Sequence, residues 1–194
     1  MENKLIEMLE HLKYEIDMLY QSTCYLLNVK KIHTEYRHTE SRLTFDDTSG
    51  DAPFSITPDS KNYDWVCKNA VIESFGLHSR NIIEFLFFPP KSDYLRAQNY
   101  FEMSGNKSLI KFKTKKKDFT RLLNKINNDI SHLTLNRLGK TIEKMSWDFA
   151  ENASKIGDAL KDFTSLLNNK AVNNIIGDSI DKLLSLASSP MEKA

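Results

Sequence analysis

The residues best suited to chemistry lie together in one segment, Asn127-Asn128-Asp129-Ile130-Ser131-His132. In an α-helix, residues three and four apart share a face, so both Asn128 and Asp129 can reach the ring of His132. Imidazole exchanges protons near neutral pH, and a neighbouring amide or carboxylate can orient it. These three residues are therefore the candidate catalytic group, with His132 as general acid or base.

An ordinary structural role for His132 stays open beside the catalytic one. A histidine near the C-terminal end of a helix can hydrogen-bond the last carbonyls and complement the helix dipole. Asn127 and Asn128 favour the functional role slightly, because asparagine is a middling helix former and two adjacent ones within a helix need a reason.

A second histidine, His78, interrupts the apolar stripe of a helix predicted over about 64–88. The usual role of such a residue is a core histidine that donates to a neighbouring carbonyl or carboxylate. Metal sites in helical bundles often use a Glu-x-x-His pair from each of two helices. Among the predicted core helices, Asp129-x-x-His132 is the one comparable spacing and a second copy is missing, so we expect no metal. The sequence also lacks a Gly-rich phosphate loop and a nucleophile elbow, and we expect no cofactor.

Arg80 is predicted to form a structural ion network. It lies seven residues after Glu73 and four before Glu84, spacings that bring the three side chains near one another on one helix face. Residues two apart are about 200° apart around a helix, so His78 and Arg80 are expected not to serve one pocket. The cysteines, Cys24 and Cys67, form no metal motif and are expected to be buried small hydrophobes.

A dense basic stretch precedes the candidate catalytic group. Lysines alternate with apolar residues and then follow one another directly, and two more cations lie on the next helix: Lys107, Lys111, Lys113, Lys115, Lys116 and Lys117, then Arg121 and Lys125. Phe112 and Phe119 are interleaved. A solvated surface loop explains this composition; a phosphate-binding surface is the alternative. In that alternative the nucleic-acid-binding residues are Lys116, Lys117, Arg121 and Lys125.

The remaining pattern is that of a helical domain. Apolar residues at helical spacing predict long helices over 3–29, 64–88, about 118–132, about 146–167 and about 170–189, with a short helix after Ser92 or Asp93. A polar loop spans about 44–61, and 108–117 is expected to be a connector rather than a strand. The 6 Gly and 5 Pro of the chain suit long helices. We therefore predict one all-α domain over 1–194, a bundle of four to five helices whose final helix can mediate a homodimer.

The composition limits the kinds of partner and the cellular compartment that we expect for this protein. The 194 residues carry 27 Lys and Arg against 26 Asp and Glu, a net charge of +1, so any nucleic-acid surface has to be local. The first residues do not resemble a signal peptide, and no apolar run approaches the roughly 20 residues that span a bilayer. We expect a cytoplasmic protein without a membrane partner.

Three stretches carry a resemblance. Residues 73–85, 130–134 and 147–149 resemble a group of small uncharacterised bacterial helical proteins. More distantly, residues 127–132 are similar to the motif of HEPN domains, helical bundles, often dimeric, in which an Arg, a polar residue and a His cut RNA without metal. Asn128 matches the polar position and His132 the histidine, whereas Asn127 replaces the arginine. The resemblance then implies that Lys125, Arg121 or a partner subunit stabilises the phosphate.

Two functions follow as expectations. The first is a HEPN-like RNA-binding or metal-independent RNA-cleaving protein of a bacterial defence or toxin system, with His132 acting on a ribose hydroxyl. The second is a non-enzymatic helical protein-interaction module, for which the missing arginine is the main argument.

Overall fold

Four long helices carry the apolar stripes expected from the sequence. The computed structural model describes residues 2–35, 60–90, 96–103, 112–131 and 147–186, in which the long helices are α1 (Glu2–Glu35), α2 (Ser60–Phe87), α5 (Phe149–Leu167) and α6 (Lys170–Ser185). Between α2 and α5 lie the short helices α3 (Ala97–Met103) and α4 (Thr120–Ile126). A 3₁₀ turn, η2 (Lys116–Phe119), precedes α4, and a π-helical turn, η3 (Asn127–Ser131), follows it. These residues include no strand, and the all-α prediction is confirmed.

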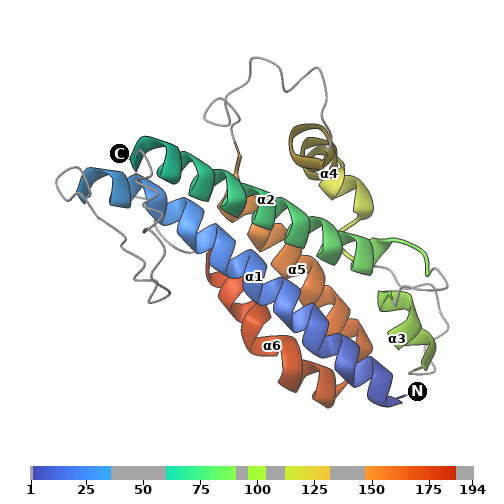
Figure 1. Ribbon diagram of the computed structural model, residues 1–194. Coiled ribbons are helices and arrows are strands. Elements are labelled where there is room, and N and C mark those ends of the chain that lie inside the picture. Colours follow the sequence, from blue (N-terminus) through green and yellow to red (C-terminus); the bar gives the residue numbers. More distant parts are fainter. Residues whose placement is uncertain (1, 36–59, 91–95, 104–111, 132–146, 187–194) are drawn as a thin grey trace, which may run out of the picture.

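The four long helices form a bundle. α1 packs against α2, α5 and α6, and α5 and α6 form a helical hairpin, with α3 and α4 at the periphery (Figure 1). α1 and α2 are antiparallel: Ser22 pairs with Ser74 (Oγ–Oγ 3.0 Å), and Glu15, two turns earlier, pairs with Asn81, two turns later. This arrangement is typical of helices whose apolar stripes bury one another.

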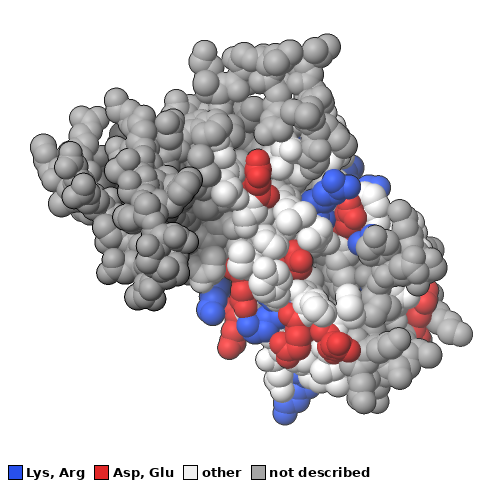
Figure 2. Space-filling view, viewed as in Figure 1, with Lys and Arg blue, Asp and Glu red and all other residues white. Residues whose placement is uncertain are grey.

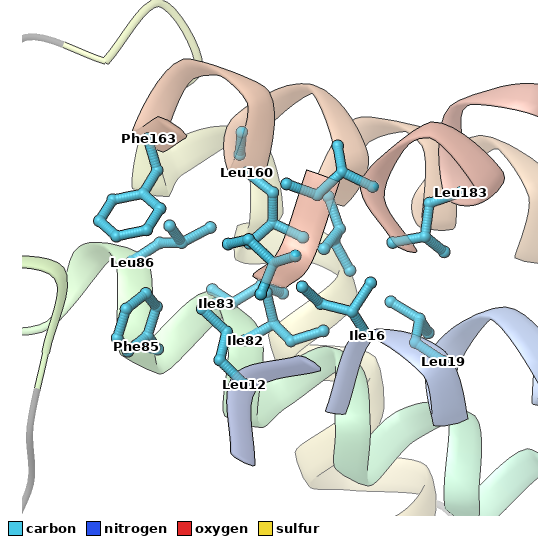
Figure 3. Packing of buried hydrophobic residues seen from close by; sticks show 14 of the residues in the cluster. Leu12, Ile16, Leu19, Ile82, Ile83, Phe85, Leu86, Leu160, Phe163 and Leu183 are labelled. Carbon is cyan, nitrogen blue, oxygen red and sulfur yellow. The ribbon is translucent and has the colours of Figure 1, made fainter. Parts of the chain in front are cut away.

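The core draws on one stripe from each long helix. Side chains from α1, α2, α5 and α6 converge in Figure 3, and the labelled ones are buried: Leu12, Ile16, Leu19, Ile82, Ile83, Phe85, Leu86, Leu160, Phe163 and Leu183. At one end Phe163 meets the rings of Phe85, Tyr100 and Phe101 edge-on, with centroids 5.4, 5.9 and 5.6 Å away. Edge-to-face packing of this kind adds to the burial energy and joins α3 to the bundle.

Polar residues cap both ends of α5 and the start of α6. Asp148 caps α5 by accepting from the Glu151 amide at 3.2 Å. Asn168 ends that helix in the left-handed region, with φ of 47°, a conformation that asparagine tolerates better than most residues. Asn169 then caps α6 by accepting from the amides of Ala171 and Val172. The break predicted at Asn168-Asn169 is confirmed.

Several predicted boundaries were wrong by a few residues. α1 continues to Glu35 rather than 29, because Lys30 and Lys31 are good helix formers without any apolar stripe. α2 begins at Ser60, so the end of the predicted 44–61 loop is helical. The helix expected from Asp118 begins instead as a 3₁₀ turn at Lys116. The remainder of the polar loop, and the predicted end of the last helix near 189, lie outside the described residues.

The apolar stripe of α6 is used within the chain. Val172, Ile176, Ile180 and Leu183 are buried, in a helix that packs against α1 and α5. A polar contact fixes the register of this packing, since the Ser179 hydroxyl donates to Asp17 Oδ1 at 2.6 Å. Among the helices described, none has an apolar stretch sufficient for a membrane span.

Candidate nucleic-acid interface

The described part of the basic stretch carries exposed cations before and along α4, whereas Lys107 and Lys111 lie outside the described residues. Five of its cations are exposed: Lys113, Lys115, Lys116, Lys117 and Arg121, named here the lysine ridge. Figure 2 shows a group of Lys and Arg side chains near the end of α2 and the start of α4, with acidic and basic side chains mixed below it. Two of the predicted contacts, Lys116 and Lys117, lie on the 3₁₀ turn, and Arg121 lies on α4.

Carboxylates bind the backbone of the ridge rather than its ammonium groups. Oδ2 of Asp162, on α5, accepts from the Lys113 amide at 2.9 Å and from the Thr114 amide at 3.3 Å. Oδ2 of Asp118 accepts from the Lys115 amide at 2.8 Å. Three consecutive N–H groups thus face carboxylates while the lysine side chains on this segment stay exposed.

Two of the cations lie over aromatic rings. Lys116 Nζ lies 3.8 Å from the ring centroid of Phe88, and Lys125 Nζ lies 4.8 Å from that of Trp147. Trp147 in turn stacks on Phe149, with planes 2° apart. Aromatic faces attract cations, so these rings hold the two ammonium groups in place. Lys125 is half-buried, which makes it the least accessible of the predicted phosphate contacts.

An acidic pair borders the far end of the ridge. The Glu151 carboxylate accepts a hydrogen bond from Lys155, and this bond, a second one shared with Asp148, and the charge of Lys155 lower the pKa of Glu151, with Arg121 adding to the effect. The hydrogen bond shared with Glu151, together with burial, raises the pKa of Asp148. Arg121 therefore lies within electrostatic range of an anion of the same chain.

The segment that carries Asn128 departs from the predicted α-helix. Residues Asn127–Ser131 form a π-helical turn, in which hydrogen bonds run i→i+5, a feature frequent at functional sites. This hydrogen-bond pattern differs from the α-helical one expected for Asn127–Ser131. Asn128 is exposed. His132 and the side chain of Asp129 lie outside the described residues.

His78 belongs to the core and not to the interface. It is 6% exposed, and its Nδ1 lies 2.6 Å from Oε2 of Glu15 on α1. The same oxygen accepts from Asn81 Nδ2 at 3.1 Å, and the Tyr14 ring meets the imidazole edge-on. The expectation of a core histidine bonded to a carboxylate is confirmed.

A shallow groove of about 350 Å³ runs beside the interface, between α2 and the α4–η3 segment. Its lining residues are Ala70, Glu73, Ser74, Leu77, His78, Arg80, Ile126 and Ile130. The expectation that His78 and Arg80 serve separate pockets was wrong, because both line this groove although their side chains bind different partners. Gly76 permits the close approach of Ile130 to α2, because a Cβ at this position would overlap Ile130 Cδ1.

The predicted ion network at the C-terminal end of α2 is confirmed for one of its pairs. Arg80 Nε donates to Glu84 Oε1 at 2.7 Å, and Arg96 Nη2 lies 3.5 Å from Glu84 Oε2. Within the described part of the chain, no group of three His, Cys, Asp or Glu residues could hold a metal ion. Cys24 and Cys67 are half-buried rather than buried.

Comparison with models of known families, with curated proteins and with solved structures found no match for this chain. The interface residues that the sequence did not reveal are Asp162 and the ring partners Phe88 and Trp147. The apolar pattern predicts both rings to lie on helices, whereas α2 ends at Phe87 and α5 begins at Phe149. Periodicity carries no information about a cation above a ring. Asp162 lies 48 and 49 residues after its amide partners, and nothing in its local sequence marks it.

Proposed function

We propose that this protein binds single-stranded RNA through the lysine ridge. The observation that carries the proposal is the exposure of five cations over nine residues while two carboxylates beside them, Asp118 and Asp162, accept from backbone amides. Phosphate groups bind such cations with release of counterions, so the affinity is electrostatic and falls with salt. The rings of Phe88 and Trp147 beside the ridge hold the Lys116 and Lys125 ammonium groups in place, which keeps these two cations near the surface that the phosphates would contact.

Binding is tested by the fluorescence anisotropy of a labelled single-stranded RNA at several salt concentrations. We expect log K to fall with log salt with a slope near −0.7 for each phosphate contact. Neutralising Lys115, Lys116 and Lys117 together as glutamines should weaken binding and flatten that slope, whereas Lys170→Gln, an exposed lysine on α6, should change neither. Absence of RNA binding at low salt would rule out the proposal.

A stronger form of the same proposal is that the protein also cleaves the RNA that it binds. In it His132 exchanges a proton with a ribose hydroxyl, Asn128 or Asp129 orients the imidazole, and Lys125 and Arg121 hold the phosphate, as in a metal-independent nuclease of a defence or toxin system. The π-helical turn beside the ridge, on which Asn128 is exposed, supports it, because such turns recur at functional sites. Incubation with RNA in EDTA tests the chemistry: cleavage that persists in His132→Ala removes His132 from the reaction.

A protein-interaction module is the second candidate, favoured by one observation. Leu77 is 54% exposed although it lines the groove on α2, and Glu73 and Arg80 flank it on the same helix face. In an antiparallel contact with a second copy, centred on Leu77, Glu73 of each chain would face Arg80 of the other. A two-fold interface is self-complementary in this sense. This surface is the homodimer face that we propose.

Charge reversal tests that contact. Sedimentation velocity should show that Glu73→Arg and Arg80→Glu each lose self-association, because like charges then face one another. A mixture of the two variants should associate again, since opposite charges are restored in both pairs. Monomeric wild type at high micromolar concentration, or no recovery in the mixture, would eliminate this candidate.

A further inference from the structure

We infer that Asp162 on α5 is a positioning residue for the lysine ridge, an inference that rests on the proposed RNA-binding function. Its carboxylate accepts from the consecutive amides of Lys113 and Thr114, at 2.9 and 3.3 Å. Residues 112–115 belong to no helix, so these amides have no helical hydrogen bonds to satisfy them. Asp162 is half-buried on a helix of the bundle, and it ties the ridge to the rigid part of the molecule.

Three contacts hold the segment of residues 112–116 along its length, and the Asp162 contact is the central one. Phe112 packs at its start against Phe87 and Phe101, with centroids 5.3 and 6.2 Å away. At its end Lys116 lies over Phe88. Between these anchors, the Asp162 carboxylate binds the backbone of residues 113 and 114, and Lys113 lies within this central part. A segment that is ordered before binding loses less conformational entropy when RNA binds.

A purely electrostatic role and a positioning role predict opposite changes in RNA affinity when the Asp162 carboxylate is removed. If Asp162 acted on RNA through its charge alone, its removal from beside the lysines would strengthen the attraction for phosphate. If it acts by holding the backbone, loss of the acceptor oxygen weakens binding even though the surface becomes more positive. The sign of the change therefore decides between them.

Two variants separate the roles. Asp162→Asn and Asp162→Ala both remove the negative charge, but only asparagine keeps an oxygen that accepts from the two amides. The matched control is Asp158→Ala, which removes an exposed carboxylate one turn earlier on α5. The measurements are anisotropy titrations with labelled single-stranded RNA at fixed salt, and hydrogen exchange of the Lys113 and Thr114 amides.

We expect Asp162→Ala to bind RNA roughly tenfold more weakly than Asp162→Asn, the scale of the neutral hydrogen bonds that the asparagine oxygen still accepts from the two amides. Asp162→Asn and Asp158→Ala should bind as wild type or slightly more tightly. Exchange of the two amides should accelerate about tenfold or more in the alanine variant alone. Equal or tighter binding by Asp162→Ala relative to Asp162→Asn would overturn the inference.

The two readouts also separate the inference from the function on which it rests. Wild-type protein that fails to bind RNA refutes the proposed function, and amide exchange then decides the backbone contact by itself. Unchanged protection of Lys113 and Thr114 in Asp162→Ala would show that the carboxylate does not hold them. Wild-type binding with no difference among the variants would leave the function standing and remove Asp162 from it.

Discussion

His78 and Glu15 form a polar contact across the α1–α2 interface, with 2.6 Å between Nδ1 and Oε2. The imidazole is almost fully buried, whereas about a quarter of the Glu15 side chain remains exposed. Asn81 donates to the same carboxylate oxygen. One glutamate thus satisfies two polar groups of α2, and it fixes the register of the two longest helices.

Replacing Glu15 with alanine should lower the free energy of unfolding by about 1–3 kcal/mol, because the buried imidazole of His78 loses its acceptor. Glu15→Gln should cost less, since the amide oxygen can still accept. Urea denaturation measures the difference. Glu10→Ala, an exposed glutamate on the same helix, is the control and should stay within about 0.5 kcal/mol of wild type.

The double variant Glu15→Ala/His78→Leu tests whether the cost comes from the unsatisfied imidazole. Leucine fits the apolar stripe that His78 interrupts, and removing both partners of a buried polar contact can be nearly neutral. We therefore expect the double variant to recover stability relative to Glu15→Ala. A double variant less stable than Glu15→Ala would show that the imidazole contributes by its packing.

The Asp17–Ser179 contact makes the free energy of unfolding depend on pH. Burial acts to raise the pKa of Asp17, but hydrogen bonds from Lys13 and Ser179 and the charges of Lys13 and Lys182 outweigh it and hold the pKa below the ordinary value of 3.8. A carboxyl whose pKa is lowered by folding stabilises the protein above its unfolded pKa, and this stabilisation is lost as pH falls through the folded value.

Ser179→Ala should therefore destabilise the protein at pH 7, by roughly 1.5–3 kcal/mol for a hydrogen bond to a charged group. The loss should shrink as pH falls below about 3.8, because a protonated Asp17 no longer has the charge that strengthens this bond. Thermal or urea unfolding between pH 3 and 7 measures the trend, together with the NMR titration of Asp17, whose pKa should rise. A destabilisation that is constant over this range would contradict the linkage.

Two helical glycines provide opposite tests of packing in the α5–α6 hairpin. A Cβ on Gly157 would lie 3.1 Å from Leu184 Cδ2 and 3.3 Å from Leu183 Cβ, whereas a Cβ on Gly177 would have no neighbour within 4 Å among the described residues. Alanine is favoured over glycine in a helix by up to about 1 kcal/mol. Gly177→Ala should thus raise the melting temperature.

Gly157→Ala should lower the melting temperature, because the added methyl group separates α5 from α6 and overpacking costs about 1–3 kcal/mol. The chemical change is the same in both variants, so calorimetry of the pair isolates the close approach from helix propensity. If both variants were stabilised, the hairpin would have room for a methyl group at Gly157.

The helices of the bundle were predictable from the sequence because the pattern that specifies each helix lies within that helix. Stripes such as Leu12, Ile16 and Leu19 recur at helical spacing, and that spacing alone decides which face is buried. The break at Asn168-Asn169 was predictable for the same reason, since both residues favour non-helical conformations at helix ends.

The interface was less predictable because its geometry depends on tertiary contacts. The π-helical turn after Ile126 lies where Ile130 approaches Gly76 on α2, a contact between residues more than fifty positions apart. The ridge could be recognised from its lysines, but Asp162 could not be assigned to it. Likewise the carboxylate that His78 binds lies on the polar face of another helix, and only the α1–α2 register identifies Glu15.

Lys117 and Lys125 should respond differently to neutralisation. Lys117 is exposed, so Lys117→Gln should leave the free energy of unfolding unchanged and reduce the salt slope of RNA binding by about 0.7, one phosphate contact. Lys125 is half-buried with its ammonium over Trp147. Lys125→Gln should therefore also lower the free energy of unfolding by roughly 0.5–1 kcal/mol, the scale of a cation–π contact.

Trp147 supplies the measurement for both variants. Its fluorescence should change in Lys125→Gln without RNA, because the cation above the ring is removed, and should stay unchanged in Lys117→Gln. If RNA displaces Lys125 from the ring, titration of wild type should shift the Trp147 emission in parallel with the anisotropy of the labelled RNA. Binding by anisotropy without a change in emission would show that Lys125 stays on Trp147, and that RNA contacts the ridge through the exposed cations alone.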